Sequence, residues 1–263
     1  MKKHIPNCIT LLNLFCGCIA ALFAAHGGFE MVALFVFLGI IFDFFDGFAA
    51  RLLKVKSGLG LQLDSLADMV TSGVVPGLVM FQLLEMSFSG GWNAGYSANA
   101  AGFSTEFSDS ILWMGFEISP MAFLPYLGFI ITLASAYRLA KFNLDENQTD
   151  AFIGLPTPAN ALLIIALPLI LIYHHNDLLN SIILNPWFLI GLTFLSAFLL
   201  NSKLKLFALK FKNWSFQDNA IRYIFLIICI VLIATISYLA IPAIIGFYIV
   251  LSIISTISAP KVN

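Results

Sequence analysis

Charged side chains are scarce in this sequence. Of its 263 residues only 10% are Asp, Glu, Lys or Arg, 60% are hydrophobic, and the formal net charge is -1. Together with a mean hydropathy of +0.95, this composition is typical of multi-span membrane proteins. The sequence also lacks a basic face with interleaved aromatic residues, so nothing in it indicates a nucleic-acid partner.

Cysteine is equally sparse, and its positions exclude two further classes of protein. The four cysteines, Cys8, Cys16, Cys18 and Cys229, are dispersed through apolar segments. Cys16 and Cys18 are two positions apart, which directs them to different faces of a helix. We therefore expect neither a zinc pair nor a disulfide framework. No sequence period of roughly 20–50 residues recurs, which argues against a solenoid.

Long apolar runs, by contrast, fill most of the chain. About eight ranges have the roughly 17–24 residues that cross a bilayer, so we predict an all-α, polytopic bundle of transmembrane helices. We treat residues 1–263 as one integral membrane domain, with a catalytic core in 1–175 and additional spans in 176–263. The first apolar run is interpreted as a span and not as a cleaved signal, because another span follows at once. The predicted spans are residues 8–25, 30–53, 60–84, 119–140, 157–173, 183–200, 220–240 and 242–258.

Basic residues all fall on one side of these predicted spans. With the N-terminus in the cytoplasm, the inner side holds all 13 Lys and Arg residues, as the positive-inside rule requires. We therefore predict a protein of the cell (plasma or inner) membrane with a cytoplasmic N-terminus. The basic residues are Lys2, Lys3, Arg51, Lys54, Lys56, Arg138, Lys141, Lys203, Lys205, Lys210, Lys212, Arg222 and Lys261.

Four carboxylates interrupt the second and third spans at their predicted cytoplasmic ends. Asp43 and Asp46 are three positions apart, and Asp64 and Asp68 are four apart, so each pair lies on one face of a helix. The short link at residues 52–59 makes the two helices antiparallel neighbours. Ionised side chains in apolar spans are costly and usually functional, and here the two acidic faces can converge on one point.

Such a convergence favours a metal site. Four carboxylates at close range repel one another unless cations lie between them. Hard oxygen ligands suit one or two Mg2+ or Mn2+ ions, and paired ions of this kind promote displacement at phosphorus. The small residues Gly47, Ala50 and Gly60 leave room for a substrate beside the acids. Arg51 can donate a bidentate pair of hydrogen bonds to phosphate oxygens.

Each pair of acids, taken alone, is compatible with another function. Asp43 and Asp46 alone are compatible with a proton relay or with the cation path of a transporter. Asp64 and Asp68 alone are compatible with a solvated helix start. A transporter would place its acids near the bilayer midplane and show paired halves, whereas these acids lie at one end and the halves show no symmetry. The transporter therefore stays a remote alternative.

The combined spacing is D-x2-D-G-x2-A-R-x8-G-x3-D-x3-D, which resembles the signature of the CDP-alcohol phosphatidyltransferases. These integral membrane enzymes join a CDP-linked donor to an alcohol and release CMP. The resemblance implies that Asp43, Asp46 and Asp64 bind two divalent ions, and that Asp68 binds one ion and acts as general base. The fixed positions are Asp43, Asp46, Gly47, Ala50, Arg51, Gly60, Asp64 and Asp68.

The resemblance also assigns the donor site. Gly47, Ala50 and Gly60 would admit the nucleotide, and Arg51 would contact the donor diphosphate. Asn7 and Thr10, at the first membrane entry, are candidates for hydrogen bonds to the cytosine or ribose. Capping of the first helix is their alternative role.

The acceptor depends on other stretches. Residues Ile5–Ala20 and Tyr137–Ala161 resemble the branch of the family that makes phosphatidylserine from CDP-diacylglycerol and L-serine. A serine carboxylate needs a cationic partner, for which we nominate Arg138, Lys141 and Asn143. Arg138 and Lys141 are alternatively ordinary positive-inside anchors, and glycerol 3-phosphate or inositol phosphate are alternative acceptors. The sequence leaves a homodimer open.

Overall fold

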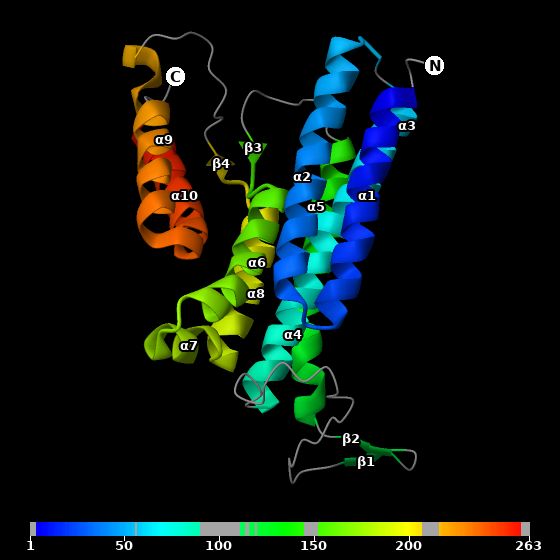
Figure 1. Ribbon diagram of the computed structural model, residues 1–263, viewed down its shortest axis with the longest axis vertical. Coiled ribbons are helices and arrows are strands. Elements are labelled where there is room, and N and C mark those ends of the chain that lie inside the picture. The colour runs from blue at the N-terminus through cyan, green and yellow to red at the C-terminus, as the bar shows by residue number, and fades with distance from the viewer. Residues whose placement is uncertain are drawn as a thin grey trace.

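The computed structural model describes residues 4–55, 57–89, 111–113, 116–118, 120–144, 152–206 and 216–258. Nearly all of this part of the chain is helical, and the helices form an elongated bundle (Figure 1). Large apolar side chains are exposed around its outside, as expected where lipid is the solvent. Examples are Phe15, Leu22, Phe37, Trp187 and Phe198. The predicted class, an all-α polytopic membrane protein, is confirmed.

The N-terminal half contributes three long rods. The hairpin between the first two turns at Gly27, whose φ of 72° is in the left-handed region that favours glycine. The Gly28 amide donates to the Phe23 carbonyl at 2.8 Å and closes the first helix. The third rod is continuous through a π-helical turn. Its elements follow in order: α1 (His4–Ala25), α2 (Phe29–Leu52), α3 (Gly58–Asp68), η1 (Met69–Val74) and α4 (Val75–Ser89).

The C-terminal half adds shorter helices and two small antiparallel ladders. The ladder of β3 and β4 pairs Phe152 with Leu206, and so joins the start of α6 to the end of α8. The elements are β1 (Ile111–Trp113), β2 (Phe116–Ile118), η3 (Pro120–Phe129), α5 (Ile130–Leu144), β3 (Phe152–Ile153), α6 (Thr157–Tyr173), α7 (Asp177–Ile183), α8 (Pro186–Asn201), β4 (Lys205–Leu206), α9 (Phe216–Ile236), η4 (Ser237–Leu239) and α10 (Ala240–Ser258).

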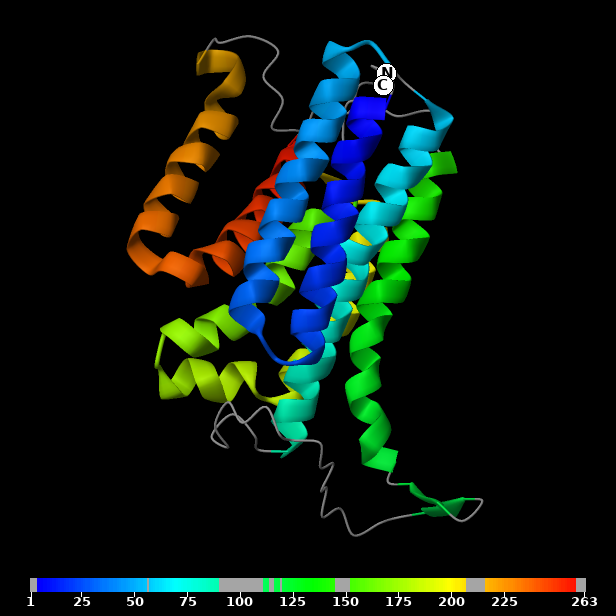
Figure 2. The same cartoon turned by 45° about the vertical axis from the view of Figure 1, so that its right-hand side comes forward.

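The predicted count of about eight spans is not confirmed. In the described part of the chain, five helical stretches are long and apolar enough to cross a membrane, or six if α7 and α8, bent by 59°, form one span. Each predicted range does hold an apolar helix, but α6 is short, at 17 residues. By length and composition, residues 222–254 form one candidate span. Within this stretch, however, α9 and α10 form a hairpin with η4 at its turn (Figure 2).

The apolar core lies in the half of the bundle remote from the acidic residues. It is built mainly from side chains of α1, α2, α4, α6 and α8, among them Ala24, Phe29, Met80, Ile164 and Leu189. Each of these is fully buried. Burial of this kind holds the long rods in register, which fixes where their polar ends meet.

The basic helix ends gather at the opposite end of the bundle from β1 and β2. The end of α2 and the starts of α1, α3 and α9 lie there together (Figures 1 and 2). Arg51 lies in the last turn of α2 and Lys141 in the last turn of α5. This arrangement agrees with the predicted segregation of charge. Six of the basic residues lie outside the described ranges: Lys2, Lys3, Lys56, Lys210, Lys212 and Lys261.

Candidate active site

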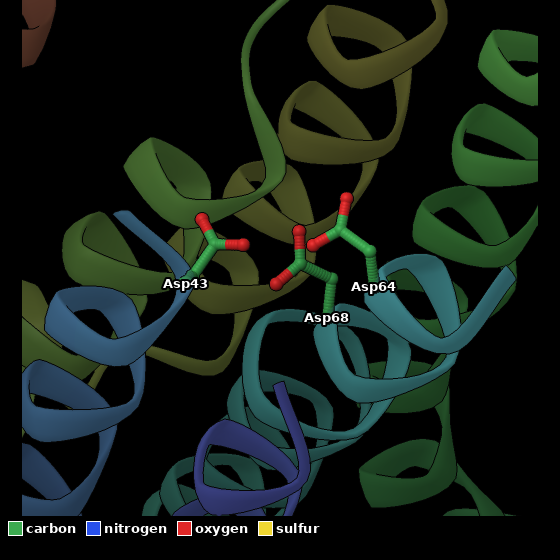
Figure 3. A group of neighbouring side chains, drawn as sticks. All are labelled: Asp43, Asp64 and Asp68. Carbon is green, nitrogen blue, oxygen red and sulfur yellow. The ribbon is translucent and has the colours of Figure 1, made fainter. Parts of the chain in front are cut away.

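Three of the four predicted acids meet between two antiparallel helices. Asp43 comes from α2, and Asp64 and Asp68 come from α3; their carboxylates point toward one another (Figure 3). One oxygen from each carboxylate lies within 4.8 Å of the other two. Of the four carboxylates that we expected to converge, these three lie together.

The fourth acid lies beside this cluster and not within it. Asp46 is buried, and its Oδ2 accepts a hydrogen bond of 2.5 Å from the Thr10 hydroxyl of α1. The same hydroxyl lies 3.1 Å from the Pro6 carbonyl. The sequence had assigned Asp46 to the metals and Thr10 to the nucleotide. The structure brings these two residues together, and both roles stay predictions.

The three-carboxylate cluster fits a divalent cation. Three negative charges at this spacing repel one another strongly in an apolar surrounding, unless a cation lies among them. Asp64 Oδ1 is buried and has no hydrogen-bond partner among the described residues, so one strong acceptor is left for a ligand. The donor set consists of hard oxygen atoms, which suit Mg2+ or Mn2+.

Open space adjoins the cluster where the nucleotide is predicted to bind. A Cβ added at Gly47 would meet nothing within 4 Å, so that face of α2 is clear. A Cβ at Gly60 would lie 3.2 Å from Asn7 Oδ1, which places the start of α1 against the start of α3. Ala50 is half-buried, and Arg51 is exposed. The Arg51 Nε donates to the Gly47 carbonyl at 3.0 Å.

The predicted acceptor residues separate in the structure. Asn143 Oδ1 accepts a hydrogen bond of 3.0 Å from Ser65, the neighbour of Asp64, so Asn143 lies against the acidic helix. Lys141 is exposed. The Nη1 of Arg138 donates to the carbonyls of Ile153 and Leu200, both at 2.9 Å. Arg138 therefore connects α5 to β3 and to α8. Both hydrogen bonds use Nη1, and neither uses Nε or Nη2.

Gly154 makes the arrangement around Arg138 possible. Its φ is 72°, and a Cβ there would lie 2.6 Å from the Leu200 carbonyl and 2.9 Å from Arg138 Nη1. We expect Gly154→Ala to lower the apparent Tm in detergent, at a cost of about 1–3 kcal/mol, because it adds backbone strain and a steric clash. The matched control is Gly191→Ala in α8, where a Cβ meets nothing within 4 Å. Equal melting of the two variants would contradict the prediction.

Two polar residues near the acids escaped the sequence analysis as functional candidates. Asn13 Nδ2 donates to Asp68 Oδ1 at 3.2 Å, and Ser65 bonds Asn143. Asn13 is a polar residue within the first apolar run. Its position there was the usable signal, since a polar side chain inside a span usually has a partner on another helix.

A separate apolar hollow of about 310 Å³ lies between α2 and α6. Glu30 and Tyr173 line it, and the Tyr173 hydroxyl donates to Glu30 Oε1 at 2.6 Å. Glu30 and Asp43 both belong to α2 and are separated by roughly 20 Å along the helix axis. This hollow is therefore not part of the carboxylate site.

The sequence is also similar to those of known proteins. The sequence model for CDP-alcohol phosphatidyltransferase matches residues 3–198, which extends from α1 into α8. A Bacillus subtilis protein named CDP-diacylglycerol–serine O-phosphatidyltransferase is 30% identical over 184 residues, covering 68% of this chain and 81% of the relative.

Two further relatives carry the same name. The protein of Helicobacter pylori strain J99 is 31% identical over 162 residues, covering 61% of this chain and 55% of the relative. The Methanocaldococcus jannaschii protein is 29% identical over 192 residues, covering 73% of this chain and 71% of the relative. The match thus spans about half the length of the Helicobacter relative and most of the other two.

Proposed function

The chain belongs to the CDP-alcohol phosphatidyltransferase family, and from that premise we propose that it transfers the phosphatidyl group of CDP-diacylglycerol to L-serine. The products are phosphatidylserine and CMP. The names of the relatives at about 30% identity support this choice of substrates. The observation that carries the proposal is the meeting of Asp43, Asp64 and Asp68, whose oxygens lie within 4.8 Å of one another, in a motif that matches the family signature.

Asp43, Asp64 and Asp68 would hold divalent cations, Mg2+ or Mn2+, with Asp46 as the neighbouring fourth carboxylate. Two ions are proposed, as the family signature implies. When bound, such ions neutralise phosphate charge and stabilise the attacking and leaving oxygens of an in-line displacement. The buried, unpartnered Asp64 Oδ1 supports this assignment.

The proton transfer is assigned to Asp68. Its carboxylate takes the proton of the serine hydroxyl, and the serine oxygen forms a bond to the phosphorus that carries diacylglycerol. The bond from that phosphorus to the CMP oxygen breaks, and CMP leaves with the electron pair. The signature offers no separate nucleophile, so transfer is direct, without a covalent enzyme intermediate.

The donor would bind along α2. The clear face at Gly47 supports a nucleotide close to the helix backbone, with Ala50, Gly60, Asn7 and Thr10 around it. Arg51 has one nitrogen engaged with its own helix. Its remaining N–H groups are available for the donor diphosphate, where a guanidinium binds two oxygens at once.

The acceptor would approach from the basic end of the bundle. Asn143 would contribute to the acceptor site, and its hydrogen bond from Ser65, the neighbour of Asp64, supports this choice. Arg138 and Lys141 would supply positive charge for the serine carboxylate. The basic helix ends support a site at the cytoplasmic face of the cell membrane.

The domain organisation and a homodimer stay proposals. We retain a single domain over 1–263, with a core in 1–175 and added spans in 176–263. The family match covers residues 3–198 and so extends beyond the proposed core into α8.

An acceptor panel tests the proposal. Purified protein with CDP-diacylglycerol and Mn2+ should release CMP with L-serine and much less with glycerol 3-phosphate or inositol phosphate. Preference for a phosphorylated acceptor would keep the reaction class and reject serine. If no acceptor supports CMP release and the protein instead takes up metal into proteoliposomes, the enzyme hypothesis would be rejected in favour of a transporter.

A further inference from the structure

A buried polar chain leads from the middle of α1 to the carboxylate cluster. Asn13 is 0% exposed and Thr71 is 1% exposed. The Thr71 hydroxyl donates to Asn13 Oδ1 at 2.9 Å, and Asn13 Nδ2 donates to Asp68 Oδ1 at 3.2 Å. The three side chains form an unbroken donor-to-acceptor sequence that joins η1, α1 and α3.

The chemistry of the three groups permits one orientation of the Asn13 amide. An ionised carboxylate can only accept hydrogen bonds, so the amide nitrogen must face Asp68. The amide oxygen then faces Thr71, which has a hydroxyl proton to donate. A reversed amide would place two acceptors against each other at Asp68. Leaving a buried polar group unpaired is destabilising, and this penalty favours the orientation with the amide nitrogen toward Asp68.

Packing of the surrounding backbone restricts the same side chains. A Cβ at Gly39 of α2 would lie 2.9 Å from Asn13 Oδ1 and 2.8 Å from Thr71 Cγ2. A Cβ at Gly17 of α1 would lie 3.1 Å from the Thr71 amide nitrogen. Two glycines thus let α1, α2 and η1 approach closely enough to clamp the pair. No larger residue fits either position without moving this network.

The π-helical turn places Thr71 in this network. It begins at Met69, directly after Asp68, and π turns within α-helices are often found at functional sites. Within this turn the Gly73 carbonyl accepts a hydrogen bond of 3.0 Å from the Thr132 hydroxyl of α5. Thr71 then faces α1, where Gly17 makes room for it.

We propose that Asn13 and Thr71 are positioning residues that fix the Asp68 carboxylate for its part in the reaction. This inference rests on the proposed function in one respect, which is the assignment of Asp68 as the general base. A carboxylate is otherwise free to rotate about its last bond, and small misplacement of a reacting group lowers the rate strongly. Because both side chains are buried, we expect neither to contact a substrate, so their effect should fall on the chemical step and on metal affinity.

The test compares Thr71→Val, which removes the hydroxyl at nearly constant volume, with Thr71→Ser, which keeps it. Asn13→Leu removes the amide. The matched control is Thr193→Val, a fully buried threonine whose hydroxyl bonds its own helix at Leu189. We expect Thr71→Val and Asn13→Leu to lower kcat about 10–100-fold. KM for CDP-diacylglycerol should stay within about threefold, and Thr71→Ser should recover most of the rate.

A second readout does not depend on activity. Mn2+ affinity, measured by electron paramagnetic resonance, should weaken about 10-fold in Thr71→Val and stay unchanged in Thr193→Val. Equal kcat and Mn2+ affinity in Thr71→Val and Thr193→Val would overturn the inference. A loss that follows only the melting temperature, without recovery in Thr71→Ser, would overturn it too. If wild-type protein releases no CMP with any acceptor, the proposed function fails, and the Mn2+ comparison still decides the positioning role.

Discussion

Asp68→Asn should lower kcat for CMP release by roughly 10³-fold, the range that a positioned general base supplies. The amide has nearly the shape of the carboxylate, and its oxygen can still accept the hydrogen bond that Asn13 donates at 3.2 Å. It cannot take up the serine proton, and it is a weaker ligand for a divalent cation. The measurement is release of CMP by purified protein with labelled serine and saturating Mn2+.

A remote acid supplies the control for this prediction. Asp177 is exposed in the first turn of α7, at the end of the bundle away from the carboxylates (Figure 1). Asp177→Asn should leave kcat within about twofold, as is usual for surface substitutions. Turnover of Asp68→Asn at the wild-type rate would remove Asp68 from the role of base, whatever the fate of the metal assignment.

Removal of divalent metal should abolish turnover, and Mg2+ or Mn2+ should restore it. Without a cation the carboxylates of Asp43, Asp64 and Asp68, whose oxygens lie within 4.8 Å, repel one another and would repel the donor diphosphate. The experiment titrates the purified protein with EDTA and measures CMP release. EDTA already saturated with Mg2+ is the control, since it should not inhibit. Full activity in free chelator would contradict the metal assignment.

Stability gives the same prediction a test that needs no substrate. A cation that binds the folded protein raises its apparent Tm by mass action, so Mn2+ should stabilise the wild type. Asp64→Asn replaces a carboxylate whose Oδ1 is buried without a partner, and should lose most of that shift. Asp177→Asn should retain it. A full Mn2+ shift in Asp64→Asn would exclude Asp64 as a ligand.

Local pattern was sufficient for much of this site. A spacing of three residues puts Asp43 and Asp46 on one helix face, a spacing of four does the same for Asp64 and Asp68, and the short link at residues 52–59 makes those faces neighbours. Helical period is a property of adjacent residues, so it can be read from the sequence alone. The apolar composition likewise determined the class of protein, because length and hydropathy suffice to recognise membrane helices.

The structure corrected what depends on how a long apolar run folds. The ranges predicted as eight spans all contain helices, yet only five or six described stretches meet the length and composition of a span. Hydropathy does not report the 59° bend between α7 and α8, whereas the break between α9 and α10 agrees with the separate ranges 220–240 and 242–258 predicted from the sequence. The bend follows from packing and from local backbone geometry, to which the average over a window is insensitive.

Arg138 shows the limit for single residues. Its place at the end of a span indicated either an acceptor ligand or a membrane anchor, and the structure adds a third role, since Nη1 donates to the carbonyls of Ile153 and Leu200. No pattern in the sequence indicates a bond between a side chain and the backbone of another helix. Such a bond forms only once the backbones are in place.

The sequence by itself determined the membrane class, the helical faces and the identity of the acidic residues, because each depends on neighbours within a few turns. Tertiary structure alone decided that Asn13 reaches Asp68 and that Thr71 reaches Asn13, across separations of 55 and 58 residues. It also decided that Asp46 bonds Thr10 beside the cluster. The physical reason is that these contacts depend on the close approach of α1, α2 and η1 at Gly17 and Gly39, which helical periodicity does not encode.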